Sequence, residues 1–336
     1  MQGLTKTLTR LFGLTVGSLI LTGQLAQAET LRIAQQYGFA SLPLMVTQQQ
    51  ELITKKAAEM GIPDLDVEWS TFSGGTTMNE ALVSGNLDIA AAGVTPLLTI
   101  WDKTKGSLNV KGLVSLGSIP LVMTTNKPQI KTLKDLSASD KIALPAVKVS
   151  VQAAFLQMAS AATFGQDGFS QLDTLTVSMP HPDAATALMS GGTEITAHIT
   201  SSPFVEQELA HPGIHKVASS HDVLGSTTNV ALYTSEAFYN GNPKLVEVVA
   251  SAVSEAMEFI NRDKPATARI YKEMTGTSLS EDLLLAALND ETNVFTTVPQ
   301  GFMKYAGFLH ERGALKNKPE SWKDIFFSVA HSLSGS

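Results

Sequence analysis

Residues 69–96 read WSTFSGGTTMNEALVSGNLDIAAAGVTP and contain a complete strand–helix–strand unit. The pattern predicts a strand over residues 67–72, a helix that ends near Gly85, and a second strand over residues 87–92. Each strand ends in a loop of small residues, Ser73-Gly74-Gly75-Thr76 and Gly93-Val94-Thr95-Pro96. In an open parallel sheet, ligands bind beyond the carboxyl ends of the strands, so both loops point to one place. The loops lack a nucleophile, a general base and a metal ligand, which favours binding over catalysis.

Length and composition allow two globular domains. The chain has 336 residues, of which 43% are hydrophobic and 16% are charged, with a formal net charge of −7. Lys and Arg are scattered and outnumbered, which argues against binding to nucleic acid. Cysteine is absent. The sequence therefore excludes disulfides, thiolate catalysis, thiolate metal sites and a cysteine-linked lipid.

The first 28 residues have the pattern of a secretory signal peptide. Lys6 and Arg10 form a positive segment, residues 11–21 are apolar, and Ala26-Gln27-Ala28 forms a small-x-small cleavage site. The alternative is a membrane anchor, but this apolar run is much shorter than the ~20 residues that span a bilayer. We expect cleavage after Ala28 and a periplasmic location.

Strands and helices alternate along the remaining chain, which predicts parallel sheets with helices on their faces. The pattern predicts a first lobe over residues 29–120, a second over residues 121–230, and a return to the first over residues 231–336. The first lobe should begin with a strand over residues 31–34 and a single helix over residues 44–60. The expected fold is α/β, with two lobes, each a mainly parallel sheet, joined by two crossover segments.

Three segments carry a resemblance to a known family: the helix start at residues 73–76, EALVSGNLDIA at residues 80–90, and Ser201-Ser202-Pro203-Phe204. Together with the export signal, they resemble the periplasmic solute-binding proteins of ABC importers that take up nitrate, sulfonates, taurine or thiamine precursors. The resemblance extends from about Leu31 to the C-terminal helices. It implies a type II-like periplasmic binding protein fold, whose lobes close on a ligand and then dock on a membrane permease.

Candidate ligand contacts in the first lobe lie in three loops. At Ser73-Gly74-Gly75-Thr76, a helix N-terminus favours an anion, although ordinary helix capping explains the same residues. Val94 and Thr95 repeat the arrangement one strand later, and Val94 has packing as its alternative. After the first strand come Gln36, whose amide both donates and accepts, and the aromatic residues Tyr37 and Phe39, which either cover a planar ligand or pack within the lobe.

Candidate contacts in the second lobe also follow strands. Lys148 and Ser150 precede a predicted helix, where Lys148 would neutralise an anion or remain a solvated surface lysine. His181 lies between two prolines and is either a ligand contact or a structural loop residue. Ser201 and Ser202 bring hydroxyl groups to another strand end.

Other titratable residues have structural interpretations. Asp88 directly follows a helix stop and is expected to cap or orient that turn rather than to act as a catalytic acid. His198 lies inside a predicted strand. The histidines show no close metal-binding repeat such as H-x-x-x-H, and no G-x-S-x-G motif is present. We therefore expect no catalytic residue, no metal and no cofactor.

The expected function is that of a catalytically inert, monomeric receptor for a small solute, which it delivers to an ABC permease at the inner membrane. Helix N-termini and hydroxyl groups favour an anionic head group, and the aromatic residues allow an organic body such as that of a sulfonate, a taurine-like compound or a carboxylate. The absence of arginine from the predicted loops argues against a bidentate clamp. One alternative is an enzyme of the pyrimidine and thiamine-precursor branch, whose cysteine-rich motif is missing here. The other is a periplasmic sensor that signals to a membrane kinase.

Overall fold

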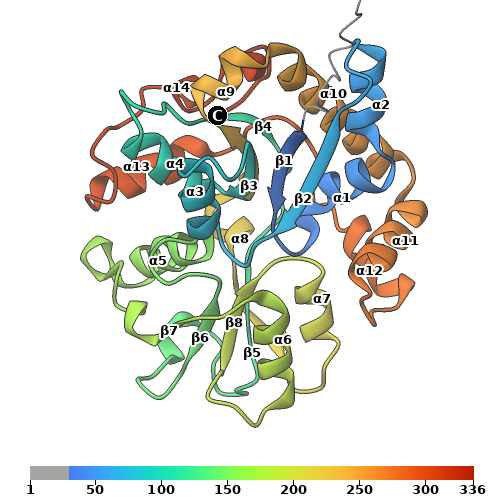
Figure 1. Ribbon diagram of the computed structural model, residues 1–336. Helices are drawn as coiled ribbons and strands as arrows, with labels where there is room; N and C mark the ends of the chain where they lie inside the picture. The colour runs from blue at the N-terminus through green and yellow to red at the C-terminus, as the bar shows by residue number, and fades with distance from the viewer. Residues whose placement is uncertain (1–29) are drawn as a thin grey trace, which may run out of the picture.

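The computed structural model describes residues 30–336 and contains two five-stranded sheets with helices packed around them (Figure 1). The predicted signal peptide, residues 1–28, lies outside the described residues. The strands of the first sheet are β1 (Thr30–Gln35), β2 (Asp66–Thr71), β3 (Ile89–Gly93), β4 (Lys111–Ser115) and β10 (Val230–Thr234). Those of the second sheet are β5 (Val122–Thr125), β6 (Ile142–Leu144), β7 (Thr176–Ser178), β8 (Ala197–Thr200) and β9 (His215–Ser219).

The two sheets have the same strand order and the same single reversed strand. The first is ordered β2-β1-β3-β10-β4 and the second β7-β6-β8-β5-β9. β10 is antiparallel to both of its neighbours, and so is β5, whereas the remaining pairs are parallel. β5 and β10 are the strands by which the chain enters each sheet from the other one, so they run against the strands that end at the cleft. The predicted α/β fold with two mainly parallel sheets is confirmed.

Helices cover both faces of each sheet, and we call the two sheets with their helices the first and second lobes. The first lobe contains α1 (Leu42–Gln49), α2 (Leu52–Glu59), α3 (Gly75–Val83), α4 (Val94–Lys103), α9 (Glu236–Gly241), α10 (Pro243–Arg262), α11 (Lys264–Thr275), α12 (Glu281–Asn289), α13 (Phe302–Glu311) and α14 (Trp322–Ile325). The second contains α5 (Val151–Phe164), α6 (His181–Ser190), α7 (Phe204–Leu209) and α8 (Ser220–Leu224). Among residues 30–336, no helix has the length and apolar composition of a membrane span.

Alternating side chains of the first sheet pack into two separate cores. Ile33 and Ile89 lie in a core with α1, α2 and α10, whereas the intervening Ala34 and Ala90 lie in a core with α3 and α4. This alternation is the two-residue period of a strand. The second core continues into the other lobe and includes Phe155 of α5. Packing on both faces of the first sheet therefore fixes the positions of the strand ends that point toward the second lobe.

The predicted single helix over residues 44–60 is wrong. The structure has two helices, α1 and α2, separated at Gln50 and Glu51. Glu51 has a φ of 54°, in the left-handed region, which ends the first helix and changes the direction of the chain. Leu52 and Ile53 are buried after this turn, and both α1 and α2 pack against α10. Tertiary packing on α10 therefore overrides a helical pattern that is locally continuous.

Asp88 has a structural role, as expected from its position before β3. Its carboxylate accepts hydrogen bonds from the backbone N–H of Arg32 at 2.8 Å and from Nε and Nη2 of the same residue at 2.9 and 2.7 Å. Arg32 Nη1 also donates to the carbonyl of Gly85 at 2.7 Å. This bidentate pair fixes the turn between α3 and β3 against β1.

Candidate ligand-binding cleft

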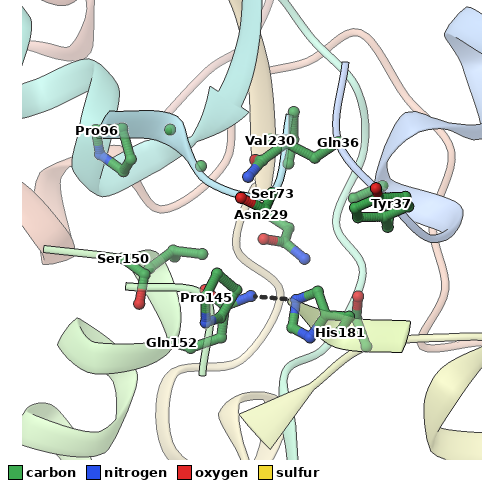
Figure 2. Close-up of a pocket in the computed structure, with 15 residues that line it drawn as sticks. Gln36, Tyr37, Ser73, Pro96, Pro145, Ser150, Gln152, His181, Asn229 and Val230 are labelled. Atoms are coloured by element: carbon green, nitrogen blue, oxygen red, sulfur yellow. Dashed lines mark hydrogen bonds between the residues drawn. The ribbon is translucent and has the colours of Figure 1, made fainter. Parts of the chain in front are cut away.

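A cavity lies between the lobes at the carboxyl ends of the strands, and we call it the inner cavity (Figure 2). The space open to the centre of a water molecule is about 30 Å³. The first lobe lines it with Gln36, Tyr37, Ala40, Ser73, Gly75, Gly93, Pro96, Asn229 and Val230. The second lobe lines it with Pro145, Ser150, Val151, Gln152, His181 and Ser201. The residues come from the carboxyl ends of six parallel strands, from the loops and helix starts that follow them, and from the start of β10.

Part of the predicted contact set meets at this cavity. The residues that line it are Gln36, Tyr37, Ser73, Gly75, Ser150, His181 and Ser201. Ser150 also caps α5, because its hydroxyl oxygen accepts a hydrogen bond from the Ala153 N–H at 3.2 Å. His181 is not a loop residue, since it begins α6. The remaining predicted contacts lie elsewhere.

Phe39, Val94 and Thr95 are buried in the first lobe instead of facing the cavity. The ring of Phe39 is fully buried and packs edge-on against Tyr271, with ring centres 5.1 Å apart. Val94 is fully buried in the core of α3 and α4, and Thr95 is 1% exposed. These three side chains therefore do not line the inner cavity, which favours the packing alternative for Phe39 and Val94, and their contact with a ligand stays a prediction.

Gly74, Thr76, Lys148 and Ser202 also lie outside the lining of the inner cavity. Thr76 is exposed and lines a different surface depression with Val149. Lys148 is exposed, with a φ of 65°, which fits the alternative of a solvated surface lysine. Ser202 donates to Glu206 Oε1 at 2.8 Å and accepts from Asn293 Nδ2 at 2.9 Å, so its hydroxyl already has two partners.

Asn229 and Gln152 are cavity residues that the sequence analysis did not identify. Asn229 directly precedes β10 at the second crossing, and its side chain lies near the centre of the cavity (Figure 2). Gln152 lies in the first turn of α5, beside the predicted Ser150. The sequence signal for Asn229 was its position: it is a polar residue at the start of the strand by which the chain returns to the first lobe.

Buried hydrogen bonds link His181 to the interior of the second lobe. His181 Nδ1 lies 2.9 Å from His198 Nε2, and His198 Nδ1 lies 2.6 Å from Glu208 Oε1. Thr124 Oγ1 donates to Glu208 Oε2 at 2.5 Å. His198 and Glu208 are completely buried. We call Thr124, Glu208, His198 and His181 the buried chain.

Glu208, at the inner end of the buried chain, sets the direction of the hydrogen bonds between its members. A carboxylate only accepts, so His198 donates from Nδ1 to Glu208, and its Nε2 then accepts from His181 Nδ1. His181 Nε2 in turn accepts from Gln152 Nε2, 3.2 Å away (Figure 2). Burial, and to a lesser extent the neighbouring His198, hold the pKa of His181 well below its usual value of 6.5. His181 is therefore a neutral cavity wall at neutral pH, with both ring nitrogens occupied.

The cavity offers oriented dipoles rather than formal charges. Among residues 30–336, those that line it include no Asp, Glu, Lys or Arg. α3, α4 and α6 begin at its edge without a hydrogen bond from a capping side chain of the described chain. The positive ends of the helix dipoles and the N–H groups of the first turn of α3 favour an anion there. α4 and α6 offer fewer donors, because the Val94 N–H already donates to the carbonyl of Asn229 at 3.0 Å, and Pro96 and Pro182 have no N–H. Across residues 30–336, no cluster of three or more His, Asp or Glu side chains is arranged to hold a metal ion.

The lobes touch each other around the cavity. The backbone N–H of Phe39 donates to the carbonyl of Ser202 at 2.8 Å, and Asn293 reaches the hydroxyl of the same serine. Gly93 faces Val151 so closely that a Cβ on Gly93 would lie 3.0 Å from Val151 Cγ1. The described arrangement is therefore a closed one, in which glycine at position 93 permits the approach.

We expect Gly93→Ala to weaken ligand binding about tenfold, because the added methyl group pushes against Val151 and holds the lobes apart. Overpacking of this kind costs about 1–3 kcal/mol. Isothermal titration calorimetry measures the affinity, and small-angle X-ray scattering with saturating ligand measures closure. Gly307→Ala in α13 is the matched control, since its Cβ would meet nothing within 4 Å. Unchanged affinity in Gly93→Ala would show that the lobes can close with a methyl group at this position, and would contradict the prediction.

Solved structures with a similar fold support this architecture. The alkanesulfonate-binding protein SsuA from Xanthomonas axonopodis pv. citri, bound to MOPS, is 19% identical, with a TM-score of 0.68 over 87% of this chain and 96% of that chain. The nitrate-binding protein NrtA from Synechocystis PCC 6803 is 13% identical, with a TM-score of 0.68 over 91% and 86%. The CA3427 gene product of Candida albicans, described as having the generic periplasmic binding protein fold, is 16% identical, with a TM-score of 0.66 over 89% and 96%. The predicted periplasmic binding protein fold is confirmed.

Sequence comparison gives a family assignment independently of the fold. No protein with a curated description matches the chain. The model of the NMT1-like family matches residues 26–275, which is most of the sequence. The chain therefore belongs to the NMT1-like family.

Proposed function

We propose that the protein is the solute-binding receptor of an ABC importer. It captures a small anionic organic solute, such as a sulfonate or a carboxylate, between two closing lobes and delivers it to a permease in the inner membrane. The receptor acts in the periplasm as a monomer, after removal of residues 1–28. The observation that carries the proposal is the inner cavity, which both lobes line at the carboxyl ends of their strands.

The chemistry of the cavity supports binding of an anionic head group without catalysis. Several helix N-termini, the hydroxyl groups of Ser73 and Ser201, and the amides of Gln36 and Asn229 surround it. These groups supply hydrogen-bond donors to an anion. His181 does not act as a general base in this arrangement, because His198 and Gln152 already occupy its ring nitrogens.

The structural relatives support the same class of role. One was solved as an alkanesulfonate-binding protein and another as a periplasmic nitrate-binding protein. The inner cavity alone is too small for an organic anion the size of MOPS, since about 10–15 Å³ of such space is needed for a single water. An organic ligand therefore places its head group in the inner cavity and its body beyond it.

The test is a thermal-shift screen with protein that has been unfolded and refolded to remove bound solute. The panel contains sulfonates, taurine, nitrate, and aliphatic and aromatic carboxylates. A ligand that binds only the folded state, present at 100 times its dissociation constant, adds about 2.7 kcal/mol to the free energy of unfolding. We expect an organic sulfonate or carboxylate to give the largest shift.

A matched pair of variants connects the shift to the cavity. Asn229→Ala removes a cavity amide and is expected to lower affinity about tenfold or more, the cost of a hydrogen bond to a charged group. Asn86→Ala changes an exposed asparagine and should leave affinity unchanged. A cooperatively folded sample that none of the compounds stabilises would contradict the proposed ligand class, and turnover of any compound would contradict a purely binding role.

A further inference from the structure

A second and larger cavity adjoins the inner one, and we call it the side chamber. Its volume is about 560 Å³, against about 30 Å³ for the inner cavity. Gln36 and Tyr37 line both spaces and so form the boundary between them. Tyr37 stands at the edge of the inner cavity (Figure 2) and is 38% exposed. A ligand whose head group occupies the inner cavity can therefore extend past Tyr37.

The walls of the side chamber are aromatic, sulfur-containing and amidic. Trp69 of β2, Phe204 of α7 and Tyr271 of α11 supply ring surfaces, and Met45 and Met274 supply polarisable side chains. Within residues 30–336, the lining of this chamber includes no Asp, Glu, Lys or Arg. Aromatic faces and methionine sulfur favour flat, apolar or weakly polar groups. The chamber thus fits an uncharged ring better than a second charged group.

Tyr271 is held in place by a residue that does not itself reach the ligand space. Phe39, buried behind it, packs edge-on against its ring at 5.1 Å. This contact keeps Tyr271 as a rigid wall of the chamber, and rigid aromatic walls reduce the entropy lost on binding. Phe39, which the sequence analysis proposed as a ligand contact, therefore contributes to the chamber indirectly, through its packing against Tyr271.

Gln35 provides an independent sign that the chamber receives a ligand. This glutamine lines the chamber and is only 6% exposed. Its Nε2 makes one long hydrogen bond to Gln48 Oε1 at 3.5 Å, and its Oε1 has no hydrogen-bond partner among the described residues. A buried polar atom left without a partner is costly, so a ligand donor at this wall of the chamber would relieve that cost. A rotation of the Gln35 side chain would turn this oxygen toward the chamber, where it can accept from an N–H or O–H on the ligand.

We propose that the side chamber is the second half of the ligand site. It takes an uncharged aromatic or heteroaromatic body that carries a hydrogen-bond donor for Gln35, while the anionic head group lies in the inner cavity. The volume of the chamber is within the range of about 300–1,000 Å³ that is typical of organic-ligand pockets. The inference rests on the proposed receptor function and narrows its ligand to an aromatic anion rather than a small aliphatic or inorganic one.

Both lobes build the chamber, so an occupied chamber also favours closure. Pro182, Phe204 and Gln207 come from the second lobe, whereas Trp69, Tyr271 and Gln35 come from the first. A ring that contacts both sets is bound more tightly by the closed form than by an open one. The body of the ligand therefore contributes to affinity through the same motion as the head group.

Two probes with one head group test the inference. Isothermal titration calorimetry with the purified protein compares 4-aminobenzenesulfonate, which has a ring and an amino donor, with methanesulfonate, which has neither. We expect the ring compound to bind about tenfold more tightly or better, because it buries a ring that methanesulfonate lacks. Trp69→Ala and Gln35→Leu should remove most of this ratio and change methanesulfonate binding by less than about threefold.

Controls separate loss of the chamber from loss of the fold. Trp69→Phe retains a ring and should retain most of the ratio, and Gln49→Leu changes an exposed glutamine of α1 and should preserve it fully. Equal binding of the two sulfonates by the natural protein would overturn the side-chamber proposal and leave the receptor function standing. A ratio that survives in both Trp69→Ala and Gln35→Leu would overturn it as well. Failure of both sulfonates to bind would contradict the sulfonate class of the proposed function alone. The same comparison is then made with 4-aminobenzoate and acetate, where equal binding would overturn the side-chamber proposal.

Discussion

Glu208→Ala is expected to destabilise the protein by about 2–6 kcal/mol. The change removes the carboxylate that accepts from Thr124 Oγ1 and His198 Nδ1 in a completely buried environment. Each of the two donors is then left without its strong acceptor, at a cost of about 1–3 kcal/mol apiece. Urea denaturation followed by circular dichroism measures the free energy of unfolding and should show a lower midpoint.

Two further substitutions make this result specific. Glu208→Gln keeps the volume and one accepting oxygen, so its loss should be smaller than that of Glu208→Ala. Glu59→Ala removes an exposed carboxylate at the end of α2 and should stay within about 0.5 kcal/mol of the natural protein. A loss below about 1 kcal/mol for Glu208→Ala would mean that water or a rearranged side chain replaces the carboxylate, and that the buried chain is not a stabilising unit.

Acidification is expected to destabilise the natural protein more than it destabilises the variant His181→Gln. The pKa of His181 is held well below its unfolded value, first by burial and then by His198. Below about pH 6.5 the unfolded chain therefore binds a proton that the folded protein does not bind. Stability is retained above this pH and falls by about 1.4 kcal/mol per pH unit below it, until the folded pKa is reached.

The groups around His181 determine how this effect must be measured. His198 of β8 contacts it directly, and Glu208 of α7 bonds to the far nitrogen of His198. Glu206 lies two residues earlier on α7, where it accepts from Ser202, and Asp183 lies on the helix of His181 itself. Burial raises the pKa of Glu206, so this carboxyl stabilises the folded state on acidification and opposes the effect of His181. The informative quantity is therefore the difference in unfolding free energy between the natural protein and His181→Gln at each pH.

We expect that difference to change steadily as the pH falls below about 6.5, by at most about 1.4 kcal/mol per pH unit, measured by urea denaturation in one buffer series. His211→Gln, which alters an exposed histidine between α7 and β9, should follow the natural protein throughout. Parallel curves for the natural protein and His181→Gln would show that the folded protein accepts the proton on this side chain after all.

Sequence reasoning located most of the strand ends that form the cleft and only part of their side chains. Gly75 and Thr76 are neighbours in one predicted loop, yet Gly75 lines the inner cavity and Thr76 faces a different depression. Once a helix starts, each residue turns about 100° from the last, so a loop motif predicts the place but not the direction of each side chain. Ser73, Ser150 and Ser201 reach the cavity, whereas Ser202 is bonded to Glu206 and Asn293.

By itself, the sequence determined the α/β class, the two lobes with mainly parallel sheets and the common edge at which the loops meet. These features depend on hydrophobic periodicity, glycine stops and the alternation of strands and helices along the chain, which can be read from short stretches of sequence. Only the tertiary structure decided that helix 44–60 breaks at Glu51, that Asn229 and Gln152 enter the cavity, and that Glu208 supports His181 through His198. It likewise decided that Gln35 and Trp69 face a chamber beside Tyr37. Contacts of this kind join residues that are distant in the chain, and their geometry follows from how the layers and the lobes pack.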